Sequence, residues 1–102
     1  MKVSIITATW NSEKTLQACL DSVAYQAAIA DIEHIIIDGR SSDSTLAIVA
    51  RYPHISQVVS AKDRGIYHAF NRGISLATGD IVYFLNSDDC LYDDNTVANV
   101  IS

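Results

Sequence analysis

The chain has 102 residues, of which 49% are hydrophobic, and its formal net charge is -5. This length supports one small domain, and the hydrophobic content is enough for a packed core, so a disordered chain is disfavoured. Nucleic-acid binding is disfavoured because the basic residues do not cluster. Apolar runs fall short of the ~18 residues of a transmembrane helix, and Met1-Lys2 leads straight into a predicted strand. We therefore expect a cytoplasmic protein.

Four segments have the composition of β-strands. They are rich in β-branched and apolar residues and span residues 2–8, 32–38, 55–60 and 81–85. A predicted helix follows each strand, and the helices after the first and third strands have apolar residues at helical spacing. This alternation predicts an α/β fold, namely a Rossmann-like, mainly parallel sheet with helices on both faces and with the first strand internal.

Polar residues and glycines set the expected helix boundaries. Ser12 followed by Glu13 predicts the start of the first helix, with Ser12 as the N-cap and about Gln26 as the end. The second helix should run from Asp43, as a first-turn acid, to about Arg51, and the third from about residue 66 to 77 with Gly79 as its C-terminal cap. A last helix should begin at Asp93 or Asp94.

The most informative stretch is residues 81–85 followed by Asn86-Ser87-Asp88-Asp89. Five consecutive apolar residues predict a central strand buried on both faces, and ligands of parallel α/β sheets bind at the carboxyl ends of the strands. Asp88 and Asp89 repel each other unless a cation lies between them. We expect Mn²⁺ or Mg²⁺, with Asn86 and Ser87 as further oxygen donors. The alternative is a polar turn that caps the next helix.

The other strands also end in polar residues that could contact a ligand. The first leads through Thr7-Ala8-Thr9-Trp10-Asn11, the second ends at Asp38-Gly39, and the third leads into Lys62-Asp63-Arg64-Gly65. Parallel strands end at one edge of a sheet, so we expect these segments to converge there. For Asp63 and Arg64, a solvated ion pair is the alternative to a ligand contact.

The order and spacing of these segments resemble the amino-terminal, nucleotide-sugar-binding half of a family 2 glycosyltransferase with the GT-A fold. The resemblance covers nearly all of the chain. It rests on residues 7–11 for the TxTYN motif, 37–45 for VDDGSTDGT, 63–67, 71–73, and 84–89 for a DxD-type metal motif. Gly39 and Asn86 stand where these motifs carry Asp.

The resemblance implies a role for each matching position. Residues 8–11 would lie against the nucleobase with Trp10 stacked near it, Asp38 would contact the base or ribose, and Asp63 the donor. Asp88 and Asp89 would hold the ribose and the diphosphate-bound metal. The implied nucleotide-sugar-binding residues are Thr7, Ala8, Thr9, Trp10, Asn11, Asp38, Asp63, Arg64, Gly65, Asn86 and Asp88, and the implied metal ligands are Asp88 and Asp89.

The implied activity is metal-dependent, inverting glycosyl transfer from a nucleotide-diphosphate sugar, with UDP-sugars favoured. The acceptor would be a glycan or a lipid-linked glycan in polysaccharide or envelope synthesis, with peripheral membrane association of the full protein. Residues 1–102 are expected to form one donor-binding domain, a truncated GT-A domain incomplete at its carboxyl end, with the general base beyond Ser102. Alone, the chain should bind nucleotide weakly, transfer nothing and self-associate through an unpaired strand edge or an exposed apolar face.

Two other functions fit a small parallel α/β domain. One is a non-catalytic nucleotide-binding or interaction module of the same fold. The other is a receiver or flavodoxin-like domain, which is disfavoured because a receiver needs an acidic pair after its first strand, where this chain has Thr9-Trp10-Asn11. A phosphate-loop nucleotidase is excluded because the sequence lacks GxxxxGK[ST].

Overall fold

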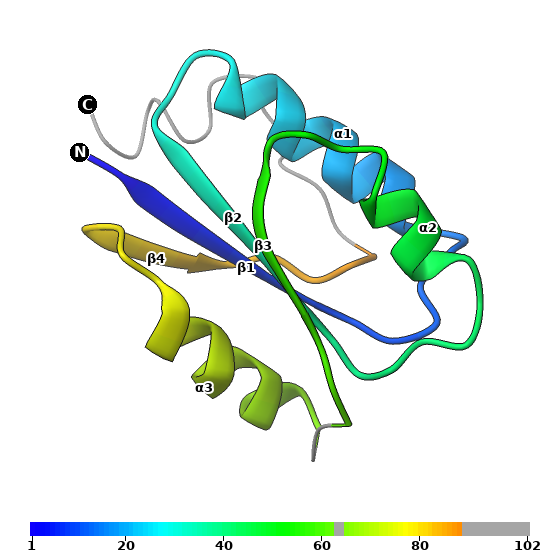
Figure 1. Cartoon of the computed structure of the whole chain (residues 1–102). Helices are drawn as coiled ribbons and strands as arrows, with labels where there is room; N and C mark the ends of the chain where they lie inside the picture. The colour runs from blue at the N-terminus through cyan, green and yellow to red at the C-terminus, as the bar shows by residue number, and fades with distance from the viewer. Residues whose placement is uncertain (63–64, 89–102) are drawn as a thin grey trace.

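A computed structural model describes residues 1–62 and 65–88. Strands and helices alternate along these ranges (Figure 1). The elements are β1 (Val3–Thr9), α1 (Leu16–Ala27), β2 (Ile32–Asp38), α2 (Thr45–Val49), β3 (Ile55–Ser60), α3 (Ile66–Leu76) and β4 (Ile81–Phe84). The predicted α/β fold is confirmed, whereas the helix expected from Asp93 or Asp94 lies outside the described residues. No helix within those ranges is long and apolar enough to cross a membrane.

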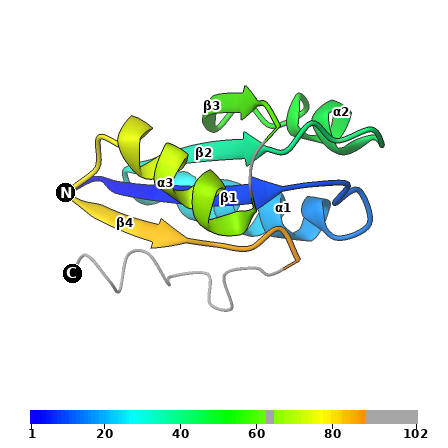
Figure 2. The ribbon, with the colours of Figure 1, turned by 90° about the horizontal axis from the view of Figure 1, so that it is seen from below.

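The strands form one sheet in the order β3-β2-β1-β4, and every neighbouring pair is parallel (Figure 2). β1 is internal, as predicted. Thr9 pairs with Asp38 at the ends of β1 and β2, and Asp38 pairs with Ser60 at the end of β3. The loops that follow these three strands therefore leave the sheet at one edge.

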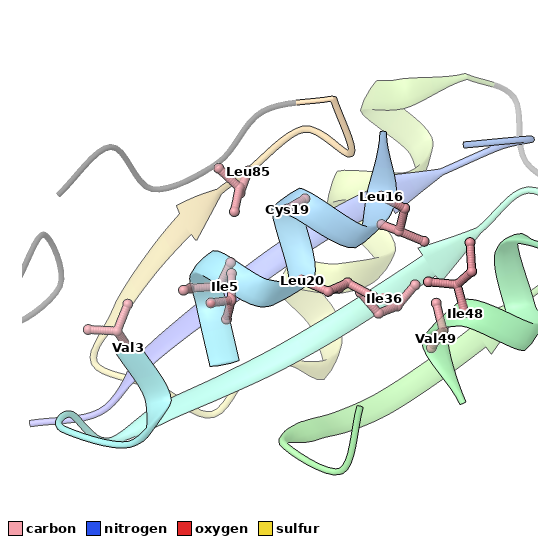
Figure 3. Packing of buried hydrophobic residues seen from close by; sticks show 10 residues of the cluster. Val3, Ile5, Leu16, Cys19, Leu20, Ile36, Ile48, Val49 and Leu85 are labelled. Carbon is pink, nitrogen blue, oxygen red and sulfur yellow. The ribbon is translucent and has the colours of Figure 1, made fainter. Parts of the chain in front are cut away.

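The two faces of the sheet are covered by different helices. On one face, α1 and α2 pack on a cluster that includes Val3, Ile5 and Ile36 (Figure 3). On the other face, α3 lies over the neighbouring strand positions, such as Ile6 and Ile35. This division follows from the alternation of side chains along a strand. Cys19 is fully buried in the α1 cluster.

The prediction that residues 81–85 form a central strand buried on both faces is wrong. Among the described strands β4 lies at the edge, and Val82, Tyr83 and Phe84 are 39%, 40% and 44% exposed. On the face of Val82 and Phe84, the physical reason is the position of α3, which lies over β1 and β2 rather than over β4 (Figure 2). Phe84 contacts α3 through Phe70, with the ring centroids 4.4 Å apart. An apolar run alone does not distinguish a central strand from an edge strand.

Two predicted helix starts also need correction. α1 begins at Leu16 rather than at Glu13, because the Ser12 carbonyl accepts from the N–H groups of Thr15 and Leu16 in a turn before the helix. The Ser12 hydroxyl does not cap α1 but bonds the backbone of Trp10. α2 is only Thr45–Val49, and Asp43 lies before it.

Gly79 is not the C-terminal cap of α3, which ends at Leu76. Its N–H donates to Ser4 Oγ over 2.8 Å. A Cβ at position 79 would lie 2.5 Å from that oxygen and 2.8 Å from the Ser4 backbone nitrogen. Close approach of two backbones, rather than a left-handed cap, therefore explains this glycine.

A buried acid fixes the start of β4 at the amino edge of the sheet. Glu33 accepts from Ser4 Oγ over 2.8 Å, and from the N–H and hydroxyl of Thr78 over 2.8 and 2.9 Å. Burial raises the pKa of Glu33, but these hydrogen bonds outweigh it and hold the pKa below its ordinary value. The network joins the link before β4 to β1 and β2, and so aligns the opposite end of β4 with the other strand ends.

Candidate functional site

A pocket of about 640 Å³ lies at the carboxyl edge of the sheet. Its walls come from the β1–α1 loop, the loop before α2, and the residues after β4. They are formed by Ala8, Asn11, Ser12, Glu13, Lys14, Thr15, Asp43, Asn86, Ser87 and Asp88. Segments far apart in the sequence meet here, as the strand order predicts.

Asn11 joins the first two walls. It has a left-handed backbone, with φ 45°, and its N–H donates to Ser41 Oγ over 2.9 Å. Its side-chain Oδ1 accepts from the Ser42 N–H over 2.8 Å. The β1–α1 and β2–α2 loops are therefore bonded to each other through backbone and side chain of the same residue.

Charged side chains add a second connection between these loops. The Glu13 N–H donates to Asp43 Oδ2 over 3.2 Å, and the Ser44 N–H donates to Glu13 Oε2 over 3.1 Å. Asp43 also accepts from the Thr45 N–H over 2.9 Å at the start of α2. Asp43 is thus a loop residue of the pocket wall rather than the first-turn helix acid that the sequence predicts.

The residues after β4 are held against the turn into α1. The Leu85 N–H donates to the Ile6 carbonyl over 3.0 Å, and the Leu85 side chain is buried in the α1 cluster. Ser87 Oγ lies 3.0 Å from Ser12 Oγ. This contact places the exposed residues Asn86 and Asp88 beside the β1–α1 loop, where both line the pocket.

Three of the predicted site residues are buried. Thr7 is hydrogen-bonded to His34 Nε2 over 2.9 Å, and Thr9 donates to Asp38 over 2.6 Å. Burial raises the pKa of the Asp38 carboxyl, but hydrogen bonds from Ser41, Thr9 and Ser60 outweigh that effect and hold the pKa below its ordinary value. These residues do not line the pocket.

The remaining predicted residues are distributed as follows. Ala8, Asn11, Asn86 and Asp88 line the pocket. Trp10 is 67% exposed, which leaves its ring accessible to a base, and Gly65 is exposed with φ 113°. Asp63, Arg64 and Asp89 lie outside the described residues.

Sequence reasoning missed several pocket residues, of which Lys14 is chemically the most important. Among the described residues that line the pocket, Lys14 is the cation, whereas Glu13, Asp43 and Asp88 are anions. The position of Lys14 in the sequence could have indicated this role, because Lys14 comes just after the exit of the first predicted strand. The segment around it was predicted only to start a helix. An anionic ligand here would need a cation to offset the three carboxylates.

The oxygen donors of the pocket fit a divalent metal held jointly with a ligand. Among the described residues, no group of three or more His, Cys, Asp or Glu side chains could hold a metal. Asp88, Asn86 and Ser87 nevertheless supply carboxylate, amide and hydroxyl oxygens beside one pocket. Mg²⁺ and Mn²⁺ bind oxygen donors, and Mg²⁺ usually keeps water and phosphate oxygens in its shell. A partial protein ligand set therefore suits a metal–diphosphate complex.

Sequence comparison determines the family. A family model described as "Glycosyl transferase family 2" matches residues 4–102. The chain belongs to glycosyl transferase family 2. This family 2 chain is 43% identical over 101 residues to a "PGL/p-HBAD biosynthesis glycosyltransferase" of Mycobacterium bovis. The alignment covers 95% of the chain and 39% of that relative, so the chain spans less than half of the relative's length.

Solved structures show the same fold for this family 2 chain. Staphylococcus aureus TarS in complex with UDP-GlcNAc aligns with a TM-score of 0.88 and 29% identity, over 99% of the chain and 30% of TarS. The mannosyltransferase PcManGT of Pyrobaculum calidifontis, in complex with GDP-Man and Mn²⁺, aligns with a TM-score of 0.86 and 29% identity. That alignment covers 97% of the chain and 31% of PcManGT. The predicted GT-A fold is confirmed.

Proposed function

We propose that this chain is the donor-binding part of a metal-dependent, inverting glycosyltransferase that uses a nucleotide-diphosphate sugar, with UDP-sugars favoured. One observation carries the proposal. The pocket at the carboxyl edge joins the first-strand exit to the acidic exit of β4. Structural neighbours of this family 2 chain hold UDP-GlcNAc, or GDP-Man with Mn²⁺.

The pocket residues have distinct roles in the proposal. Asp88 and Asn86 hold Mn²⁺ or Mg²⁺ together with diphosphate oxygens, and Asp89 is assigned to the same set from the sequence. When bound, the ion supplies charge neutralisation of the diphosphate leaving group. Lys14 adds positive charge on the same pocket, and the exposed ring of Trp10 offers a stacking surface for the base.

Activation of the acceptor is assigned to the complete enzyme rather than to this chain. A general base must reach the acceptor hydroxyl within hydrogen-bond distance. The pocket residues described above are committed to the donor, and the chain spans 39% of a curated relative. We place the base in the rest of the complete protein, which would act on a glycan or lipid-linked acceptor in polysaccharide or envelope synthesis.

Calorimetry of UDP binding tests the donor and metal roles together. UDP should bind at least about ten-fold more tightly with Mn²⁺ than with EDTA, because the described pocket residues include more anions than cations and a diphosphate adds further negative charge that the ion would offset. Asp88→Asn should remove most of this difference. Asp31→Asn is the matched control, since Asp31 is exposed just before β2 at the opposite edge of the sheet.

Two results would contradict the proposal. Equal binding of UDP with EDTA and with Mn²⁺ would show that the metal assignment is wrong. Metal-dependent binding of UDP-sugars by the complete protein, without transfer to any acceptor or to water, would instead identify a non-catalytic nucleotide-binding module.

A further inference from the structure

The carboxylate of Asp38 has all of its acceptor positions filled from within the protein. Oδ1 accepts from the hydroxyls of Thr9 and Ser41, each over 2.6 Å. Oδ2 accepts from the Ser41 N–H over 2.8 Å and from the Ser60 hydroxyl over 2.9 Å. A carboxylate has about four lone-pair sites, and the Asp38 residue is 0% exposed. The Asp38 carboxylate therefore has no free acceptor position and no solvent-accessible atom with which to contact a nucleotide.

The four donors come from three neighbouring strands or their exits. Thr9 ends β1, Ser60 ends β3, and Ser41 follows β2. Backbone hydrogen bonds run beside these contacts, from Gly39 N–H to the Thr9 carbonyl and from Ala61 N–H to the Asp38 carbonyl, each over 2.9 Å. The carboxylate therefore holds together three strand ends, at the edge where the pocket lies.

We propose that Asp38 is a positioning residue that fastens the ends of β1, β2 and β3 and does not contact the nucleotide. The role that the family resemblance implies for Asp38, a contact to the base or ribose, is thereby reassigned. The inference rests on the proposed function only for the identity of the ligand that the pocket receives.

A short chain of hydrogen bonds connects this fastening to the pocket. The Ser41 hydroxyl donates to Asp38 and accepts from the Asn11 N–H over 2.9 Å. Asn11 lines the pocket, and its left-handed backbone depends on the position of Ser41 and Ser42. Loss of the Asp38 carboxylate should therefore displace Asn11 and lower the binding affinity for every nucleotide by a similar factor.

The consequence for specificity follows from Gly39. The VDDGSTDGT motif carries two adjacent Asp residues, which correspond to Asp38 and Gly39 in this chain. Gly39 has no side chain, and every acceptor position of the buried Asp38 carboxylate is already hydrogen-bonded. The base is therefore not recognised by a carboxylate at either position. Uracil presents an N3–H donor that a carboxylate would accept, whereas the N3 of cytosine is an acceptor, so UDP and CDP distinguish the two roles of Asp38.

The experiment compares Asp38→Asn and Ser60→Ala with the wild-type chain. Asp31→Asn and Ser75→Ala are the matched controls, since both residues are exposed and lie away from the carboxyl edge. Asp38→Asn should lower the Tm by about 10 °C and speed amide exchange at Ser41 at least ten-fold, because a buried donor loses its acceptor. Ser60→Ala should shift both quantities in the same direction by less. The controls should leave them unchanged.

Nucleotide affinity, measured with Mn²⁺ well below each Tm, tests whether the role is positioning. UDP and CDP should lose affinity by the same factor, within about two-fold, in Asp38→Asn and again in Ser60→Ala. A loss at least about ten-fold larger for UDP than for CDP in Asp38→Asn alone would show a base contact and overturn the proposal. A lower Tm with both affinities unchanged would also overturn it, since Asp38 would then be structural only.

Failure of the proposed function would look different. If the wild-type chain bound neither nucleotide with Mn²⁺, the donor-binding assignment would fall. Amide exchange at Ser41 would still test whether Asp38 fastens the three strand ends, since this measurement needs no ligand. An unchanged exchange rate in Asp38→Asn would refute that role.

Discussion

At the residue scale, two residues other than glycine, Asn11 and Arg40, adopt a left-handed backbone conformation, and the reasons differ. Asn11 (φ 45°) accepts a hydrogen bond from Ser42 with its own side chain, which offsets the cost of this conformation. Arg40 (φ 63°) makes the turn that brings the Ser41 N–H to Asp38. The Arg40 side chain is exposed. Its backbone conformation therefore costs free energy that a glycine would avoid.

Arg40→Gly should raise the free energy of unfolding by about 0.5–1 kcal/mol, since relief of the left-handed strain exceeds the extra entropy of glycine in the unfolded chain. Urea denaturation measures this as an increase in the midpoint without a change in slope. Arg40→Ala is the control, because it removes the same charge but keeps a Cβ at this φ. An equal gain in both variants would show that charge, rather than backbone strain, sets the effect.

At the element scale, two histidines meet where the pairing of β2 with β3 begins. His34 of β2 is fully buried, and His54, just before β3, is half-buried. His34 Nδ1 lies 3.0 Å from His54 Nε2, and the two rings stack with centroids 5.2 Å apart. The buried Nδ1 of His54 has no hydrogen-bond partner among the described residues. Burial, helped by the neighbouring His54, lowers the pKa of His34 to about 3, and burial lowers the pKa of His54. Both rings are therefore neutral in the folded protein at neutral pH.

The free energy of unfolding should fall as the pH falls below 6.5. In the unfolded chain His34 takes up a proton near pH 6.5, whereas in the folded chain it does so only near pH 3. The unfolded state therefore binds more protons in this window, which costs up to about 1.4 kcal/mol per pH unit for one histidine. Urea titrations between pH 7 and 5, above the range where carboxylates dominate, measure the slope. His34→Gln should flatten it, and an unchanged slope in this variant would refute the explanation.

At the scale of the whole molecule, β4 leaves an apolar strip at the edge of the described sheet. Val82, Tyr83 and Phe84 are consecutive and partly exposed, whereas exposed residues on the other edge strand, β3, alternate with less exposed ones. Unpaired apolar edges favour association between chains. We therefore expect the chain to self-associate through β4.

Light scattering at ~0.1 mM, within the μM to mM range where such edges associate, should detect species larger than a monomer. Val82→Lys should shift the population towards the monomer, because a charged side chain on an edge opposes strand pairing. Val58→Lys places the same charge on β3 and should have little effect. A monodisperse wild-type monomer would contradict the expectation.

Local patterns predicted the order of elements but not their surroundings. β-branched runs placed β2 and β3 at the residues observed, because strand composition is a property of the segment itself. The partial exposure of Val82 and Phe84 depends on which strands α3 covers. The contacts of Ser12 with Thr45 and Ser87, and of Glu13 with Asp43, join residues 30 or more positions apart. Burial of Asp38 likewise arises only when three strand ends meet. Such long-range contacts leave no periodic signal in one sequence.

The hydrogen bonds between the β1–α1 and β2–α2 loops have a thermodynamic consequence for ligand capture. Asn11 and Glu13 already fix the two loops against each other before any ligand arrives. A nucleotide entering the pocket would not have to order these segments, so little of its interaction energy would be spent on immobilising the receptor. This edge of the sheet behaves as a pre-organised receptor, whose binding entropy is governed by the ligand and the displaced water rather than by the loops.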